Sequence, residues 1–353
     1  MNSWPRGGLV IFAIVSAAAG QVVTLRSNAY GDPAVTSAVS SSTSPIEGIL
    51  DHINHYRRLE HLEPLTENQR GSRAAASHAR YIIENRLGPG DFVIDSGRVT
   101  RGPSLATHNE ERGNPWYSAA GASIDRFGSN TFTAATIPSD ARPWIDRLMT
   151  SPVTALLVLD PTLASIGYGD YCAAGRCAAV IVYYYDRWWS QLRLAREFKL
   201  TAAADPVYGE GSCRYLKSPI QFPPSDGSFP LGSYDGGREF DDPLSGCAGY
   251  KTPTGLPIVL SLGDGLTAAG AVRLEAFALM DGAQTLESCG YDAFSYANPK
   301  SLIQETGRSI LRRKLAAVVI PRAPLKPGHT YTISMTVESQ EYKWSFKIGP
   351  DQY

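Results

Sequence analysis

The spacing of apolar residues changes along the chain, and this change constrains the fold more than any other feature of the sequence. Between residues 44 and 87, apolar side chains recur three or four positions apart, as they do on one face of a helix. Ser44-Pro45-Ile46-Glu47 is a capping box that predicts the start of a first helix, and Thr66 with Gln69 predicts the start of a second. The stretch therefore predicts two consecutive amphipathic helices.

A third helix and a pair of strands are expected next. The helix is predicted to begin at Ser139 or Asp140 and to end at Ser151-Pro152. Residues 166–169 and 178–185 predict two antiparallel strands joined by a tight tip. Helices followed by strands indicate the α+β class.

The sequence from residue 205 to the C-terminus has an all-β pattern. Short apolar segments alternate with turns rich in Pro and Gly, which favours an immunoglobulin-like β-sandwich of the kind that ends exported bacterial proteins. The segment around Tyr331 resembles a tyrosine corner, in which the phenol anchors a loop. The expected strands are Leu256–Leu262, Val272–Ala278, Ala316–Pro321, Thr332–Val337 and Trp344–Ile348.

Length and charge limit the architecture and the partners. A chain of 353 residues exceeds one ordinary core, and we expect a domain at residues 44–200 followed by another at 205–353. The 33 Lys and Arg residues balance 34 Asp and Glu residues without a block of one sign, which argues against nucleic acid as a partner. No interior apolar run approaches the length of a membrane span.

The N-terminus resembles a secretory signal. Arg6 precedes the apolar residues 8–15, and small residues follow at 16–20. We therefore expect residues 1–20 to be a signal peptide and residues 21–43 to be a flexible lead-in. The mature protein is then expected to be secreted, in the extracellular space or the cell envelope.

All five cysteines lie in the part that would be exported, where an oxidising compartment favours disulfides. Cys172 and Cys177 flank the predicted hairpin tip, so a bond between them is the first expectation. Cys213 with Cys247 is the second, and Cys289 could replace either partner.

Groups capable of chemistry gather in the irregular stretch before the third helix. His108, Glu110 and Glu111 place an imidazole and two carboxylates within four residues, and turn formers surround them. His108 and Glu110, with the aromatic residues Trp116 and Tyr117, form the predicted ligand groove. His108 with either glutamate is also a candidate for a cation site or a general base. The nucleophile motif G-x-S-x-G is absent.

The order of these motifs resembles the CAP superfamily, which comprises the cysteine-rich secretory, antigen 5 and pathogenesis-related proteins and is also called the SCP family. The resemblance covers residues 44–189 and implies a three-layer α-β-α sandwich. The histidine loop is one matching feature. The others are Asn54, Arg57, Leu62-Glu63-Pro64-Leu65, Met149-Thr150-Ser151-Pro152 and Ile166-Gly167-Tyr168-Gly169.

Departures from the family pattern bear on function. Many CAP domains place two histidines and two glutamates around a cleft that can hold a divalent metal. His108 matches the first histidine, whereas Ala122 stands in place of one glutamate and Thr154 in place of the second histidine. The other glutamate has no counterpart. The resemblance therefore implies a degenerate site that holds zinc poorly, and no cofactor is expected.

These observations favour an exported, non-enzymatic binding or envelope-associated protein. The resemblance implies a lipid, a sterol or a cell-wall component as ligand, without choosing among them. The alternative is a secreted hydrolase, directed at protein or cell wall, in which His108 acts with Glu110 or Glu111. His78 lies on the apolar stripe of the second helix, and we interpret it as a hydrogen-bonded core residue.

Overall fold

The structure is a computed structural model, and the residues that it describes all belong to one compact unit, Thr43–Tyr353. The expected signal peptide, the lead-in, His108 and Cys213 lie outside the described residues. Within the described part of the chain, no helix is both long and apolar enough to cross a membrane. The described residues are 45–87, 93–95, 98–100, 110–126, 129–134, 140, 142–185, 215–236, 243–263 and 271–350.

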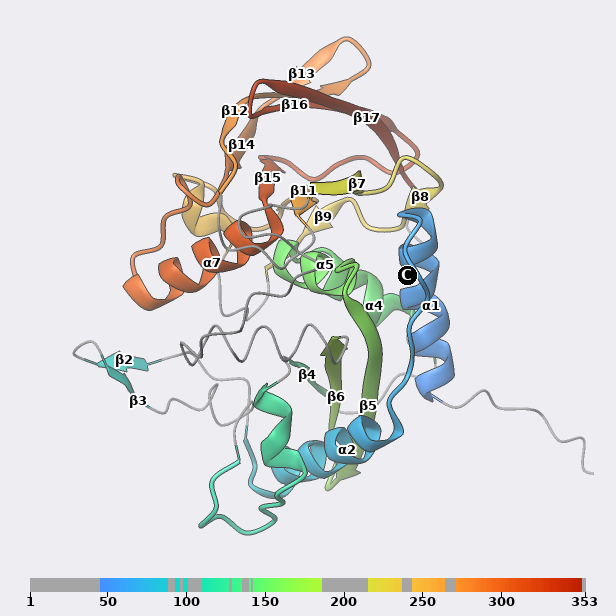
Figure 1. The fold of residues 1–353 in the computed structure, drawn as a ribbon, viewed down its shortest axis with the longest axis vertical. Coiled ribbons are helices and arrows are strands. Elements are labelled where there is room, and N and C mark those ends of the chain that lie inside the picture. Colours follow the sequence, from blue (N-terminus) through green and yellow to red (C-terminus); the bar gives the residue numbers. More distant parts are fainter. Residues whose placement is uncertain are drawn as a thin grey trace, which may run out of the picture. The chain divides into compact units, whose positions relative to one another are not determined.

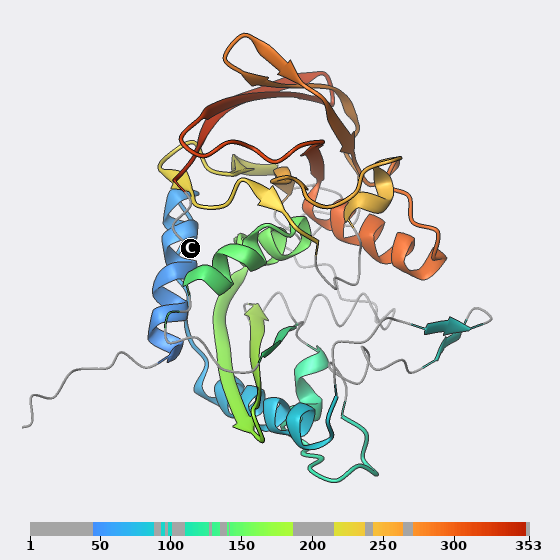
Figure 2. The ribbon, with the colours of Figure 1, turned by 180° about the vertical axis from the view of Figure 1, so that it is seen from behind.

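The N-terminal part is built on a four-stranded sheet with the strand order β1-β5-β6-β4. Strand β1 is parallel to β5, and the other neighbours are antiparallel. The long β5–β6 hairpin extends from α2 to α4 and α5 (Figures 1 and 2). The helices and strands of the N-terminal part are α1 Pro45–Leu59, β1 Thr66–Glu67, α2 Gln69–Glu84, β2 Val93–Asp95, β3 Arg98–Thr100, the 3-10 helix η1 Gly121–Arg126, β4 Ser129–Ala134, α4 Arg142–Met149, α5 Pro152–Val158, β5 Leu163–Ala173 and β6 Arg176–Tyr185.

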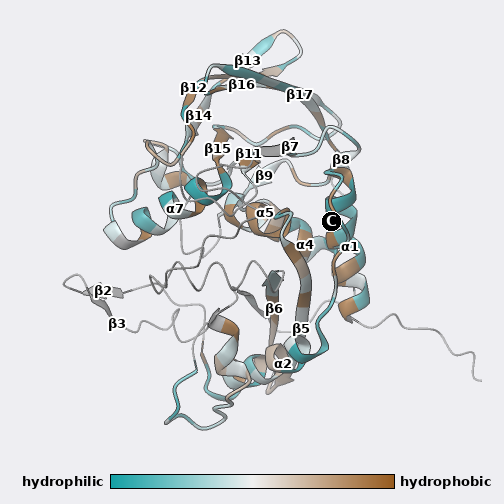
Figure 3. Cartoon of the chain, viewed as in Figure 1, coloured by the Kyte–Doolittle hydropathy of each residue, from teal (hydrophilic) through white to brown (hydrophobic). Residues whose placement is uncertain are grey.

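Alternate residues of β6 face two different hydrophobic cores. Val180 and Val182 pack with the apolar face of α2, whereas Ile181 and Tyr183 pack with residues of α1, α4 and α5. Apolar residues mark β5 and α5 in the hydropathy colouring (Figure 3). Successive side chains of a strand point to opposite faces, so this sheet is buried on both sides. The expected α-β-α layering and the α+β class are confirmed.

Two helix starts differ from the prediction. Asn68, not Thr66, caps α2, because the Asn68 side chain accepts a hydrogen bond from the backbone N of Gly71 at 2.9 Å. Ser151-Pro152 ends α4 as expected but also starts α5, where Ser151 caps the helix and Pro152 occupies its first turn. The same dipeptide can serve as stop and start because proline is well tolerated only in the first turn of a helix.

The motif residues Asn54 and Arg57 brace the N-terminal part. Asn54 exchanges two hydrogen bonds with the backbone of Leu65, at 2.7 and 3.0 Å. The Arg57 side chain is fully buried, and burial lowers its pKa to about 10. Its guanidinium donates to backbone carbonyls at the end of α5 and around it, those of Glu63, Val158, Asp160 and Leu163.

The Ile-Gly-Tyr-Gly motif of β5 lets α2 approach the sheet closely. A Cβ atom at Gly169 would lie 2.1 Å from the backbone N of Ala76, and one at Gly167 would lie 2.3 Å from the backbone of Gly71. Neither position can hold a side chain unless α2 moves away from the sheet.

The described C-terminal part is β-rich and contains three sheets, ordered β14-β15-β11-β7, β13-β12-β16-β17-β8 and β10-β9. All the expected strands are present, and the phenol of Tyr331 accepts a hydrogen bond from the backbone N of Lys326 at 2.6 Å, as the tyrosine corner predicts. The immunoglobulin-like topology stays a prediction. The elements are β7 Tyr215–Phe222, β8 Ser228–Phe229, β9 Ser233–Tyr234, the 3-10 helix η2 Pro243–Gly246, β10 Thr254–Gly255, β11 Ile258–Gly263, β12 Leu274–Asp281, β13 Gln284–Leu286, β14 Ser288–Tyr291, α7 Ser301–Lys314, β15 Ala316–Pro321, β16 Thr330–Val337 and β17 Gln340–Ile348.

Helix α7 was not predicted. Its N-cap, Lys300, makes no side-chain capping hydrogen bond, so the usual start signal is missing. Gly307 lies inside the helix and weakens its helical pattern, yet a Cβ atom there would lie 2.5 Å from the ring of Tyr296. Packing against Tyr296 therefore requires glycine at position 307, and the same glycine makes α7 hard to predict from the sequence.

Two disulfides are present among the described residues. Cys172 is bonded to Cys177 across the tip of the β5–β6 hairpin, which confirms the first expectation. The expected pairing of Cys213 with Cys247 is wrong, because Cys247 is bonded to Cys289, the alternative in which Cys289 replaces Cys213. Cys289 lies in β14, and its neighbour in the fold is the segment after η2, which the sequence spacing alone did not reveal.

Candidate functional site

Helix α2 carries the residues that hold the candidate loop. His78 lies on the helix face that packs against the sheet, and Tyr81 and Asn85 follow it three and seven positions later. Side chains at these spacings lie on one side of a helix. The rings of His78 and Tyr81 are nearly parallel, with centroids 6.1 Å apart.

A buried pair joins α2 to the loop that follows residue 109. The Nδ1 atom of His78 lies 3.1 Å from Oε1 of Glu110, and both side chains are completely buried. The other carboxylate oxygen of Glu110 accepts a hydrogen bond from the backbone N of Ser118 at 2.6 Å. Both oxygens of Glu110 are therefore engaged within the protein, as a buried carboxylate requires.

Gly121 makes room for this carboxylate. A Cβ atom at Gly121 would lie 1.8 Å from Oε1 of Glu110. The backbone N of Gly121 donates to Oγ of Ser118 at 2.9 Å, which closes the turn that Glu110 begins. The loop thus folds around the carboxylate of Glu110.

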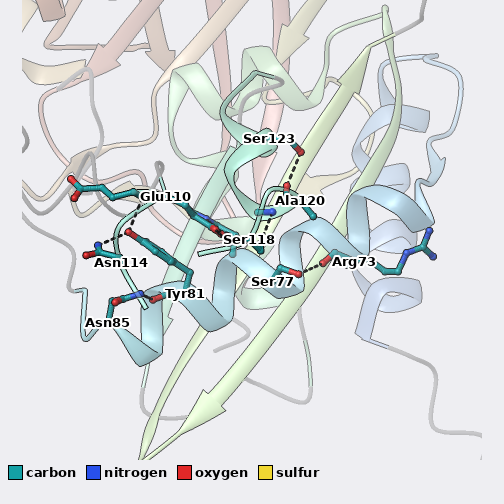
Figure 4. A network of polar contacts seen from close by, with 12 residues as sticks. Arg73, Ser77, Tyr81, Asn85, Glu110, Asn114, Ser118, Ala120 and Ser123 are labelled. Atoms are coloured by element: carbon teal, nitrogen blue, oxygen red, sulfur yellow. Dashed lines mark hydrogen bonds and ion pairs between the residues drawn. The ribbon is translucent and has the colours of Figure 1, made fainter. Parts of the chain in front are cut away.

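Tyr81 and Asn85 add further ties between α2 and the loop (Figure 4). The Tyr81 hydroxyl accepts hydrogen bonds from the backbone N of Glu111 at 3.0 Å and from the side-chain amide of Asn114 at 2.8 Å. Asn85 donates to the backbone carbonyl of Pro115 at 2.9 Å. These contacts fix the segment immediately before Trp116.

Trp116 is exposed and has an unusual backbone conformation. Its φ is +70°, a region that residues other than Gly, Asn and Asp rarely adopt. Its side chain is 46% exposed, and the guanidinium carbon of Arg80 lies 4.0 Å from the ring centroid. Arg80 also lies 5.7 Å from the Tyr171 ring and 3.9 Å from Glu84.

We call the loop residues 110–121, together with Arg80, Glu84 and Tyr171, the Trp116 platform. Tyr171 donates a hydrogen bond to Glu84 at 2.5 Å, and this bond raises the pKa of the Tyr171 phenol. The platform presents one exposed indole within a polar rim. Strained backbone at a fixed, exposed aromatic residue is a feature of binding sites more than of cores.

The predicted groove residues do not all lie at this surface. Glu110 is buried, Glu111 and Tyr117 are half-buried, and Trp116 is exposed. His108 lies outside the described residues. The interpretation of His78 as a hydrogen-bonded core residue is confirmed, although its partner was not foreseen.

The described residues do not fit the divalent metal that the family pattern implies. Ala122 has no donor atom, and Thr154 is buried in the first turn of α5, where its backbone N donates to Ser151. Both Glu110 oxygens are engaged, as above. In the described ranges, no group of three or more His, Cys, Asp or Glu side chains is arranged to hold a metal ion.

Arg80, Tyr81, Glu84 and Tyr171 were missed by sequence reasoning. Tyr171 is in β5, and its contact with Arg80 depends on how α2 lies across the sheet. No local sequence signal identifies residues whose contacts depend on tertiary packing. The one usable signal is the spacing of His78, Tyr81 and Asn85, which puts them on one side of the helix.

Comparison with known proteins supports the family assignment. Residues 50–185 match the family model described as CAP, the cysteine-rich secretory protein family. A comparison with curated proteins found no match. The matched range runs from within α1 to the end of β6 and includes the Trp116 platform. Residues 50–185 of this chain are a CAP domain of the cysteine-rich secretory protein family.

Proposed function

We propose that this chain is an exported, non-enzymatic binding protein whose CAP domain contacts its ligand through the Trp116 platform. The observation that carries the proposal is Trp116 itself, exposed at 46% and held at φ +70°. An exposed indole in a strained backbone conformation lowers the stability of the fold. A smaller, polar residue would serve better at this position if the surface had no binding role.

The ties to α2 support a binding role because they prepare the loop before the ligand arrives. Glu110, Tyr81 and Asn85 fix the loop on both sides of Trp116. A loop that is already ordered loses little conformational entropy on binding, so more of the contact energy appears as affinity.

The surroundings of Trp116 favour a polar, ring-shaped ligand over a sterol. Arg80 covers one face of the indole, and Glu84, Asn114 and the phenol of Tyr171 supply hydrogen-bonding groups nearby. A sterol needs an enclosed apolar pocket to bury most of its surface. A cell-wall polysaccharide presents sugar rings that can stack on an indole and hydroxyl groups that can bond to such a rim.

The hydrolase alternative gains no support from Glu110. A general base must reach the proton that it removes, whereas Glu110 is buried and bonded to His78 and Ser118. His108 and Glu111 are tested directly by substitution. Loss of a measured hydrolytic turnover in His108→Ala, with folding intact, would establish the hydrolase and contradict the binding proposal.

Co-sedimentation tests the proposal. The purified chain is mixed with insoluble peptidoglycan, with chitin, and with phosphatidylcholine vesicles with and without sterol. We expect sedimentation with a polysaccharide and at least about a tenfold weaker affinity for Trp116→Ala, because tenfold corresponds to the 1.4 kcal/mol of one good contact. Phe294→Ala is the matched control, since Phe294 is also exposed, at 42%, beneath an arginine.

Three results would overturn the proposal. They are binding to sterol vesicles alone, no binding to any of these probes, and equal affinities of the two variants for the polysaccharide.

A further inference from the structure

The C-terminal β-rich part packs against the helices of the CAP domain. The ring of Tyr56 in α1 lies 6.3 Å from Phe222 and 5.7 Å from Phe229, and those two rings are 5.1 Å apart. One continuous hydrophobic core runs from α1, α4 and α5 into β7, β11 and β15. The apolar outer side of these helices is therefore covered by another part of the same chain.

A buried ion pair crosses this contact. The ammonium group of Lys314, the last residue of α7, bonds to the carboxylate of Asp160, which follows α5. Lys314 is 6% exposed and Asp160 is 4% exposed. Two charges out of water are tolerated only when each satisfies the other, so removing one leaves the second buried and unpaired.

Both members of the pair are fixed by their own parts of the chain. The other carboxylate oxygen of Asp160 accepts from the backbone N and the hydroxyl of Thr162, at 2.8 and 2.7 Å, and its carbonyl accepts from Arg57 at 2.9 Å. The carbonyl of Lys314 accepts from the hydroxyl of Ser261 at 2.9 Å. The Lys314–Asp160 ion pair can therefore form only when the CAP domain and the C-terminal part are both folded.

The space beside the ion pair is nearly filled. A cavity of about 10 Å³ lies between α5 and strands β7 and β11, with Leu156, Phe222 and Val259 in its lining. This volume holds one water molecule at most. Directly after α1, Glu60 accepts a hydrogen bond from the backbone N of Gln221 at 3.1 Å. The contact therefore has the packing of a protein interior and includes polar groups that fix its register.

We propose that residues 215–348 are an obligate partner of the CAP domain within the chain, and that the two parts unfold as one cooperative unit. The matched CAP range would then not be an independent folding unit. The helices α1, α4 and α5 are closed to external ligands on the covered side. The Trp116 platform belongs to α2, on the other face of the sheet, and stays available.

Native-state hydrogen exchange of the full chain tests this inference. Lys314→Ala leaves Asp160 unpaired, and we expect exchange by global opening to become at least about 100-fold faster, the equivalent of a buried pair broken from one side. The factor is expected to be the same for core amides of β5 and β6 as for those of β11 and β15. Lys343→Ala, on an exposed position of β17, is the control and should change neither set.

A double variant keeps the test decisive if Lys314→Ala does not fold. Asp160→Asn with Lys314→Met removes both charges and nearly preserves the volume, so it should be more stable than Lys314→Ala, although the buried Arg57 loses the favourable charge of Asp160. The inference is overturned if Lys314→Ala accelerates exchange only in the C-terminal strands. Two separate calorimetric transitions of the wild-type chain would overturn it equally.

Discussion

Replacing Trp116 by glycine separates the cost of its backbone conformation from the value of its side chain. At φ +70° an L-residue carries about 1 kcal/mol of steric strain, which glycine relieves. The change loses the contact with Arg80, about 0.5–1 kcal/mol at an exposed site. It also makes the unfolded chain more flexible, which costs roughly 0.5–1 kcal/mol. The free energy of unfolding should therefore stay within about 1 kcal/mol of the wild type.

Two further variants sharpen this prediction. Trp116→Ala keeps the strain and loses the contact, so it should be less stable than Trp116→Gly, by at most about 0.5 kcal/mol. Trp144→Ala, at a buried tryptophan in α4, should cost about 3–5 kcal/mol. Urea unfolding followed by circular dichroism measures all three. A loss of more than about 2 kcal/mol for Trp116→Gly would refute the reasoning, because it would mean that the indole packs as part of the core.

Three other changes have expected outcomes. Glu110→Ala should cost about 3–5 kcal/mol in urea unfolding, because it leaves buried partners unsatisfied; a neutral or stabilising effect would instead mark Glu110 as a functional carboxylate. Burial raises the pKa of Glu60 to about 8 in the folded chain. The neutral carboxyl therefore contributes its full stability below the unfolded-state pKa near 4.3, and this contribution is lost as the pH rises through 8. Glu60→Gln should flatten that decline between pH 5 and 9, whereas Glu63→Gln, at an exposed position, should leave it unchanged; equal slopes in all three proteins would exclude the Glu60 assignment. Replacing Cys247 and Cys289 by serine opens a loop of 42 residues and should lower stability by about 4 kcal/mol in the chain-entropy model, and an unchanged urea midpoint would argue against the bond.

The elements with strong local signals were predictable. The apolar stripes of α1 and α2, the β5–β6 hairpin with its disulfide tip, and the strands of the C-terminal part all follow from spacing and turn chemistry. The tyrosine corner at Tyr331 was also predictable, because its geometry depends on residues only five positions apart.

Features that depend on tertiary packing were not predictable. Helix α7 lacks a capping side chain and contains Gly307, so only its packing reveals it. The Cys247–Cys289 bond required knowing that β14 lies beside the segment after η2. Local patterns carry no information about which distant segments meet.

The candidate site was foreseen only in part. The loop stays a predicted site, and of its aromatic residues the structure exposes Trp116. Glu110 was assigned to the groove because it lies with His108 in an irregular stretch bracketed by turn formers. The structure instead gives it a buried histidine from α2 as partner, 32 positions earlier in the chain. A pair so distant in sequence leaves no local signal.

Hydrogen exchange of the free chain tests most directly whether the platform is ordered before any ligand binds. The backbone amides of Glu111, Ser118 and Gly121 donate to Tyr81, Glu110 and Ser118, respectively. A prepared loop predicts that these three amides exchange as slowly as amides inside α2, and that Glu110→Ala releases them together. Exchange of the three wild-type amides at the rate of an unstructured peptide would contradict the account.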